Sequence, residues 1–154
     1  MEQENAKFRT FEVQGYAALK TVLNEIDSGH IFVLFSGSND ENGQSWCPDC
    51  VEAEPVIDRN LHLLSNNAVI IRCSVGDRLY WSNPSNEFRK DPELNLRYIP
   101  TLIKIGTPKK LEEKQCLSED LVQMMFEEDE EEPVKLIPPP SLTTFGYTPQ
   151  ENVQ

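Results

Sequence analysis

Short apolar runs alternate with stretches of helical periodicity along the first 126 residues, and this alternation favours α/β architecture. The run at 31–35 is continuously apolar, as expected for a central strand that is covered on both faces. The predicted elements are, in order, strand 8–13, helix 16–26, strand 31–35, helix 47–65, strand 69–73, a short helix near 83–90, strands 101–105 and 109–114 joined as a hairpin by Gly106-Thr107-Pro108, and a last helix capped by Ser118. This order predicts a mixed central sheet flanked by helices.

The composition changes at Glu127, which begins an unbroken run of six acidic residues. Five prolines follow between Pro133 and Pro149, with little periodic pattern. We therefore predict a folded domain over 1–126 and a disordered, acidic and then Pro-rich tail over 127–154. A solvated segment is the favoured interpretation of this tail, and a peptide that docks into an aromatic groove is the other.

The net charge of −12 argues against nucleic acid and anionic membranes as partners, because both require clusters of Lys and Arg. Half of that charge comes from the tail, so the predicted domain keeps −6. The polar, acidic residues 1–5 do not resemble a secretory signal, and no apolar run approaches the roughly 20 residues of a membrane helix. We therefore expect a cytoplasmic protein whose four cysteines are thiols, redox groups or metal ligands.

Cys47 and Cys50 stand two residues apart where a polar loop, 36–45, meets the second predicted helix. A pair with this spacing can close a small disulfide. At a helix N-terminus the first sulfur, expected to be exposed, would be favoured as a thiolate, which is the attacking species in disulfide exchange. Cys47 would then attack a substrate disulfide, and Cys50 would resolve the mixed disulfide.

The residues around the pair would tune this cycle. Pro48 fixes one backbone torsion and removes one N–H donor. Asp49 places a negative charge close to the sulfurs, which by itself opposes thiolate formation. Trp46 is equally well interpreted as an apolar rim beside the nucleophile or as ordinary edge packing.

Zinc is the main alternative for the cysteine pair. A structural zinc site needs four ligands, usually supplied as two pairs. The remaining candidates are His30, His62, Cys73 and Cys116, and no two of them have pair spacing. Redox chemistry is therefore favoured, and no bound metal is expected.

Ile99-Pro100-Thr101 is a second notable segment. A proline before a strand-like run is often only the start of that strand. The alternative is a cis-proline turn whose backbone lies beside the dithiol and pairs with an extended substrate. An isolated X-Pro bond is cis in only about one case in twenty, so the residues alone leave both interpretations open.

Taken together, these motifs resemble the thioredoxin superfamily and, more narrowly, a group of small cytosolic thioredoxin-related proteins. The resemblance covers residues 8–126. The segments that carry it are Ser45-Trp46-Cys47-Pro48-Asp49-Cys50-Val51, Ala53-Glu54-Pro55, Val75-Gly76, Tyr80-Trp81, Phe88-Arg89-Lys90, Pro100-Thr101-Leu102 and Gly106-Thr107-Pro108.

The resemblance implies a thioredoxin fold and a protein-disulfide reductase that receives electrons from NADPH through thioredoxin reductase, without a bound cofactor. Peroxidase activity is also ascribed to this group. The resemblance also implies that Cys47 is the nucleophile and Cys50 the resolving thiol, and that the two form a disulfide when oxidised. Pro48 and Asp49 would set the redox potential, and Pro100 would be cis, with Trp46 and Ile99 beside it at the substrate. The expected partners are thioredoxin reductase and disulfide-containing proteins or small disulfides. The protein is expected to be a monomer.

Two departures from thioredoxin stand out. The loop 36–45 is longer than the corresponding turn, which suggests a narrower substrate range. Thioredoxin carries a buried acid in its central strand that helps to deprotonate the second cysteine, and Leu34 occupies the matching position here. Asp49 or water could take over this proton transfer. The competing functional hypothesis is a redox-sensing interaction protein that uses the same fold without significant turnover.

Overall fold

The computed structural model describes residues 8–127 and contains one five-stranded sheet in the order β1-β3-β2-β4-β5. The strands are β1 (Arg9–Gln14), β2 (His30–Ser36), β3 (Ala68–Ser74), β4 (Thr101–Lys104) and β5 (Lys110–Glu112). Strands β1, β3 and β2 run parallel, whereas β4 and β5 pair antiparallel. The predicted mixed sheet and its terminal hairpin are therefore confirmed.

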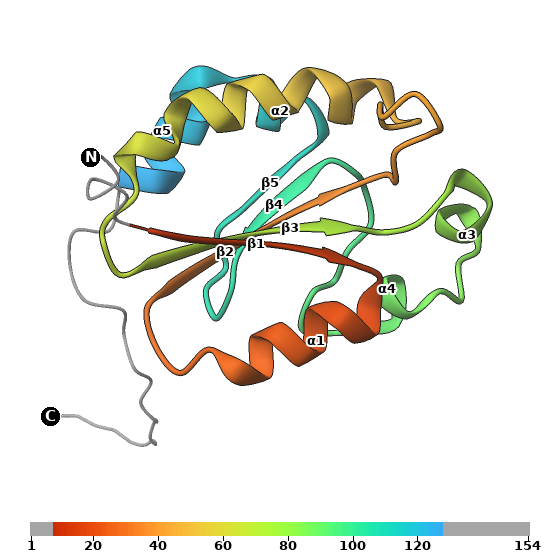
Figure 1. Cartoon of the computed structure of the whole chain (residues 1–154), viewed down its shortest axis with the longest axis horizontal. Coiled ribbons are helices and arrows are strands. Elements are labelled where there is room, and N and C mark those ends of the chain that lie inside the picture. Colours follow the sequence, from red (N-terminus) through yellow and green to blue (C-terminus); the bar gives the residue numbers. More distant parts are fainter. Residues whose placement is uncertain (1–7, 128–154) are drawn as a thin grey trace, which may run out of the picture.

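The helices cover both faces of this sheet (Figure 1). They are α1 (Tyr16–Glu25), α2 (Pro48–Asn60), α3 (Arg78–Ser82), α4 (Glu87–Lys90) and α5 (Glu119–Glu127), with the 3₁₀ turns η2 (Leu61–Leu63) and η3 (Glu113–Leu117). Helices α2 and α5 lie on one face and α1 on the other, while α3 and α4 sit at one end of the sheet. Each parallel connection crosses the sheet through a helix, as parallel strands require.

The sheet separates two apolar cores because successive side chains of a strand point to opposite faces. Val33, Phe35 and Ile71 pack on the α1 side, together with Phe88 of α4. Phe32, Leu34, Ile70 and Leu102 pack beneath α2 and α5. Strand β2 is thus buried on both faces, as its continuous apolar sequence predicts.

Several predicted elements differ in their limits. Helix α2 ends at Asn60 and continues only as the short turn η2, so the predicted helix 47–65 is too long. Strand β5 ends at Glu112, because the chain turns into η3 instead of extending to residue 114. The connection after β3 holds two short helices instead of the one predicted near 83–90, since Asp77 caps α3 through the backbone N–H of Tyr80.

The last helix begins as predicted, and the Ser118 hydroxyl accepts a hydrogen bond from the backbone N–H of Leu121. It runs to Glu127, one residue beyond the predicted domain boundary at residue 126. The predicted tail from residue 128 onward lies outside the described residues. No helix between residues 8 and 127 combines the length and apolar character that crossing a bilayer requires.

Candidate active site: the Cys47–Cys50 dithiol

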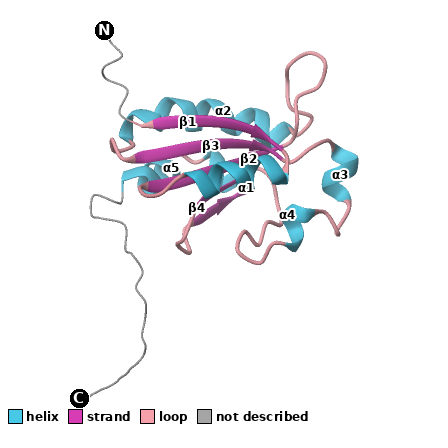
Figure 2. Ribbon diagram, turned by 60° about the horizontal axis from the view of Figure 1, so that its bottom comes forward, coloured by secondary structure: helices cyan, strands magenta, loops and turns pink. Residues whose placement is uncertain are grey.

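The cysteine pair lies where the central strand β2 passes, through a projecting loop, into α2 (Figure 2). Cys47 is the N-cap residue of α2, and Pro48 occupies the first helical turn, where its missing N–H costs the helix nothing. The backbone torsions of Cys47 are extended, so the chain turns into the helix at this residue. This local geometry brings the two sulfurs together.

Cys47 and Cys50 form a disulfide with a Cα–Cα distance of 5.2 Å. The backbone N–H of Cys50 donates a hydrogen bond to Cys47 Sγ at 3.2 Å. A hydrogen bond donated to a sulfur favours its charged form, and the positive end of α2 acts in the same direction. After reduction, the Cys47 sulfur therefore occupies a position that stabilises a thiolate.

Cys47 is less exposed than the sequence suggests. Only 5% of the residue is accessible, against 2% for Cys50. The loop before β4 covers it, since the backbone oxygen of Ile99 lies 4.0 Å from Cys47 Sγ. The expectation of an openly exposed first sulfur is therefore wrong for this disulfide form.

The Ile99–Pro100 peptide bond is cis, as the resemblance implies. The Pro100 carbonyl accepts a hydrogen bond from the backbone N–H of Glu113 at 2.7 Å, which ties this turn to η3. Thr101 begins β4, and its hydroxyl donates to the Tyr98 carbonyl at 2.6 Å. These bonds fix the backbone of the turn beside Cys47.

The loop between β2 and the cysteines is a closed, hydrogen-bonded turn. Asn39 and Ser45 form an isolated antiparallel bridge, and the Asp40 carboxylate accepts from the backbone N–H groups of Asn42 and Gln44. The Ser45 hydroxyl accepts from the Cys47 N–H at 3.1 Å. The segment Asp40-Glu41-Asn42-Gly43 is a recognisable turn signal in the sequence, whereas the Asn39–Ser45 bridge that flanks it is not.

Trp46 clamps this loop against the end of the sheet. Its indole N–H donates to the Gly76 carbonyl at 2.9 Å, and the Arg78 guanidinium lies 4.8 Å from the ring centroid. Gly37 is required under the ring, because a Cβ there would lie 2.6 Å from the indole. Trp46 thus packs at the edge of the sheet, which is one of the two interpretations that its sequence position allows.

Asp49 has a partner that the sequence does not reveal. Lys114 of η3 places its ammonium group 3.5 Å from the Asp49 carboxylate. The lysine side chain is 80% exposed, so solvent screens the pair and weakens it. Even so, Lys114 offsets part of the negative charge that Asp49 brings to the dithiol.

The other two cysteines are buried. Cys73 lies in β3 and Cys116 in η3, and burial raises the pKa of each thiol to about 12. Such thiols are poor nucleophiles at neutral pH. Within residues 8–127, no group of three or more His, Cys, Asp or Glu side chains is arranged to hold a metal ion.

Comparison with known proteins gives a consistent result. Residues 12–128 match the family described as "Thioredoxin domain-containing protein 17-like, thioredoxin domain". The chain is 46% identical over 124 residues to thioredoxin domain-containing protein 17 of Mus musculus and 44% identical to that of Homo sapiens, with 80% of this chain and 99% of each relative covered. A thioredoxin-like protein Clot of Arabidopsis thaliana is 45% identical over 74 residues, covering 47% of this chain and 55% of the relative. The architecture is therefore the thioredoxin fold.

Proposed function

Because this chain belongs to the thioredoxin domain-containing protein 17-like family, we propose that it is a protein-disulfide reductase that works through Cys47 and Cys50. Family membership indicates oxidoreductase activity in general. The observation that most supports the specific reaction is the hydrogen bond from the Cys50 N–H to Cys47 Sγ at the start of α2. It gives Cys47 the character of an attacking thiolate.

The proposed cycle has two steps. The Cys47 thiolate attacks a substrate disulfide, forms a mixed disulfide and releases one substrate thiolate. Cys50 then loses its proton and attacks Cys47 Sγ, so that the Cys47–Cys50 disulfide forms and the second substrate thiolate leaves. Both released thiolates take up protons, and two electrons have passed from the protein to the substrate.

Substrate would approach over Trp46 and the cis turn at Ile99 and Pro100. The Ile99 carbonyl lies next to Cys47 Sγ, which supports a role for this backbone in aligning an extended chain. Pro48 and Asp49 would set the redox potential, with Lys114 moderating the charge of Asp49.

The oxidised protein needs an external reductant. We assign this role to thioredoxin reductase with electrons from NADPH, in the cytoplasm and without a bound cofactor. Disulfide-containing proteins and small disulfides are the proposed substrates of a monomeric enzyme, and a peroxide is a further acceptor for the same dithiol.

The test is NADPH consumption in the presence of thioredoxin reductase and a small or protein disulfide. Steady turnover that is lost in Cys47→Ser supports the reductase. A single stoichiometric oxidation without recycling contradicts it and favours a redox-sensing interaction protein. Equal turnover by Cys47→Ser would show that Cys47 is not the nucleophile.

A further inference from the structure

The resolving step of the proposed cycle requires Cys50 to lose a proton while it is almost completely buried. Only 2% of Cys50 is accessible, the same fraction as for Cys73. Transfer of a thiolate from water to a buried, apolar site is unfavourable, so the position of Cys50 offers little solvent to receive its proton. A base near Cys50 would relieve this obstacle.

Neither the position of thioredoxin's acid nor Asp49, which the sequence suggests as a substitute, supplies this base. Leu34 is 1% exposed in β2, where a thioredoxin would carry its acid, and a leucine cannot accept a proton. Asp49 is paired with Lys114 and does not line the pocket that borders Cys50. A base for Cys50 would therefore be one of the other side chains that line this pocket.

A pocket of about 390 Å³ adjoins Cys50 between α2, the sheet and the projecting loop. Four ionisable side chains line it besides Cys50. They are Glu12 of β1, Arg72 of β3, and Glu54 and Asp58 of α2. This volume is ample for water, and its polar lining can hold water by hydrogen bonds.

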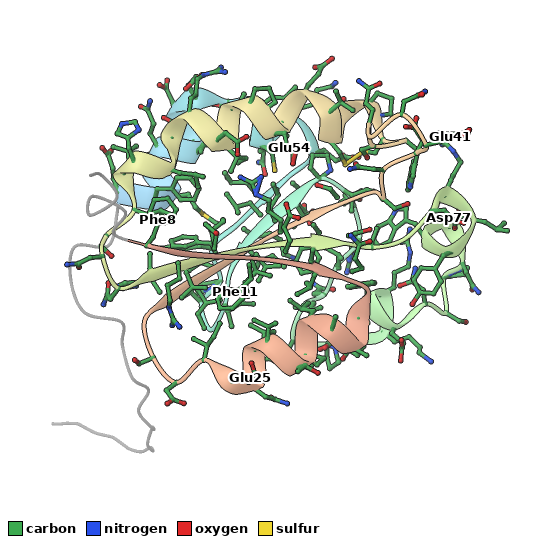
Figure 3. All side chains as sticks on the ribbon, in the orientation of Figure 1. Phe8, Phe11, Glu25, Glu41, Glu54 and Asp77 are labelled. Atoms are coloured by element: carbon green, nitrogen blue, oxygen red, sulfur yellow. A yellow bond between two sulfur atoms is a disulfide. The ribbon has the colours of Figure 1, made fainter. Side chains whose placement is uncertain are left out.

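Arg72 organises the charges in this pocket. It is aligned with Leu34 of β2 and with Glu12 of β1 in the sheet, so it lies one strand away from the position of the missing acid. Its guanidinium contacts the Asp58 carboxylate and lies 3.6 Å from the Glu54 carboxylate. Arg72 thus holds two carboxylates along the side of α2 that faces the sheet, where Figure 3 shows Glu54.

Of the two α2 carboxylates that line the pocket, Glu54 is the nearer to Cys50 along the helix. It follows Cys50 by four residues, which places the two side chains on the same face with Cβ atoms about 5–6 Å apart. That separation leaves room for one bridging water. The Glu54 side chain is 48% exposed, so a proton that it receives can pass on to solvent.

We propose that Glu54, held by Arg72, accepts the Cys50 proton through water in the resolving step. This inference rests on the proposed reductase function. The S–H bond of Cys50 breaks, its proton moves through water to the Glu54 carboxylate, and the sulfur electrons form the bond to Cys47 Sγ. The substrate thiolate leaves from Cys47, and Glu54 later returns its proton to solvent.

The test separates attack from resolution in a rapid-mixing experiment. Reduced protein is mixed with a bis-nitrobenzoate disulfide whose reduction releases one coloured thiolate for each sulfur. The first release reports attack by Cys47, and the second reports resolution by Cys50. Glu54→Gln should slow the second phase at least about tenfold at neutral pH and leave the first unchanged. Far-UV circular dichroism checks that each variant is folded.

The pH profile distinguishes proton transfer from a structural effect. Without Glu54, the rate of the second phase should rise about tenfold per pH unit, because hydroxide replaces the carboxylate as base. Glu12, Asp58 and Arg72 are the other ionisable groups in the pocket, so Asp58→Asn shows whether a neighbouring carboxylate contributes. Glu52→Gln is the matched control, since it removes the same charge from an exposed position of α2 outside the pocket.

An unchanged second phase in Glu54→Gln would overturn this inference while leaving the reductase intact. Equal slowing of both phases would also overturn it, because it would indicate a disturbed site. If the parent protein itself releases only one coloured thiolate, Cys50 does not resolve the mixed disulfide. That result would contradict the proposed reductase function as well.

Discussion

The backbone N–H of Cys50 donates a hydrogen bond to Cys47 Sγ at 3.2 Å, so the proposed resolving residue also supports a negative charge on the proposed nucleophile. This bond exists because Cys47 caps α2 while Cys50 lies within its first turn. The spacing of two residues between the cysteines thus serves both steps of the proposed cycle. It closes the disulfide, and it places a helix N–H on the attacking sulfur.

Selective alkylation tests whether the Cys47 thiol is more reactive than the thiols of Cys73 and Cys116. In the reduced native protein, iodoacetamide at neutral pH should modify Cys47 first. Cys73 and Cys116 should stay unmodified, because a thiol with a pKa of about 12 has a thiolate fraction on the order of 10⁻⁵ at pH 7. Mass spectrometry of a time course measures this order. Early labelling of Cys73 or Cys116 in folded protein would contradict it.

The pair between Asp49 and Lys114 predicts two small effects of opposite sign. Lys114→Gln should slow the attack of Cys47, because the negative charge of Asp49 is then no longer offset. Asp49→Asn should speed it. Each change should stay within about fivefold, since the pair is exposed and screened by solvent. Stopped-flow rates at low and high salt provide the measurement, and changes of the same sign would refute this reading.

Gly37 lies so close to Trp46 that even a methyl group should disturb the loop. Gly37→Ala would place a Cβ 2.6 Å from a rigid ring, and we expect a loss of about 1–3 kcal/mol in the free energy of unfolding. Urea denaturation measures it. In a Trp46→Leu background the same substitution should cost less, because the rigid indole is absent. Equal costs in both backgrounds would show that the indole is not the obstacle.

Tyr16 anchors the connection that leads to the cis turn. Its hydroxyl donates to the Asp91 carboxylate at 2.6 Å, and this bond raises the pKa of Tyr16 to about 12. Although burial opposes ionisation of Asp91, the bonds from Tyr16 and the Glu93 backbone, with the charge of Lys20, lower the pKa of Asp91. Tyr16→Phe keeps the edge-to-face contact with Phe88, and should cost about 1.5–3 kcal/mol at neutral pH.

The pH dependence of that cost follows from the lowered pKa of Asp91. A carboxyl group whose pKa is lower in the folded state stabilises the protein above its unfolded value, about 3.9, and loses this contribution as the pH falls through the folded value. The difference between parent and Tyr16→Phe should therefore shrink below about pH 4. Tyr98→Phe at an exposed position is the control. If the difference in free energy of unfolding between parent and Tyr16→Phe does not change with pH, the hydrogen bond to Asp91 is not the source of the stabilisation.

The sequence predicts those features that depend on local patterns. The apolar run of β2, the turn after β4 and the cysteine pair at the start of α2 all follow from residues within a few positions of each other. Helix α3 is missed because it has only five residues, and Trp81 within it is buried by the folded domain. Contacts such as Tyr16–Asp91 and Asp49–Lys114 join residues far apart in the chain, so no spacing rule reveals them.

The position of Leu34 also shows that sequence patterns do not reveal contacts between distant residues. The sequence identifies the absence of thioredoxin's acid there, but the neighbouring charges become visible only when β1, β3 and α2 are assembled. Arg72 is aligned with Leu34 through strand pairing, and it reaches Glu54 across the space beneath α2. The four-residue spacing places Glu54 on the same face of the helix as Cys50, but no spacing rule indicates that Arg72 meets them there.

The most direct test of the central claim is trapping of the mixed disulfide. Reduced Cys50→Ser protein is mixed with a disulfide-linked peptide and analysed by mass spectrometry, with Cys47→Ser as the matched control. We predict a stable adduct of one peptide on Cys47, no adduct in the control, and release of both peptide thiols by the parent protein. Failure of Cys50→Ser to form the adduct, or an adduct on Cys73 or Cys116, would contradict the assignment of Cys47 as nucleophile and Cys50 as resolving thiol.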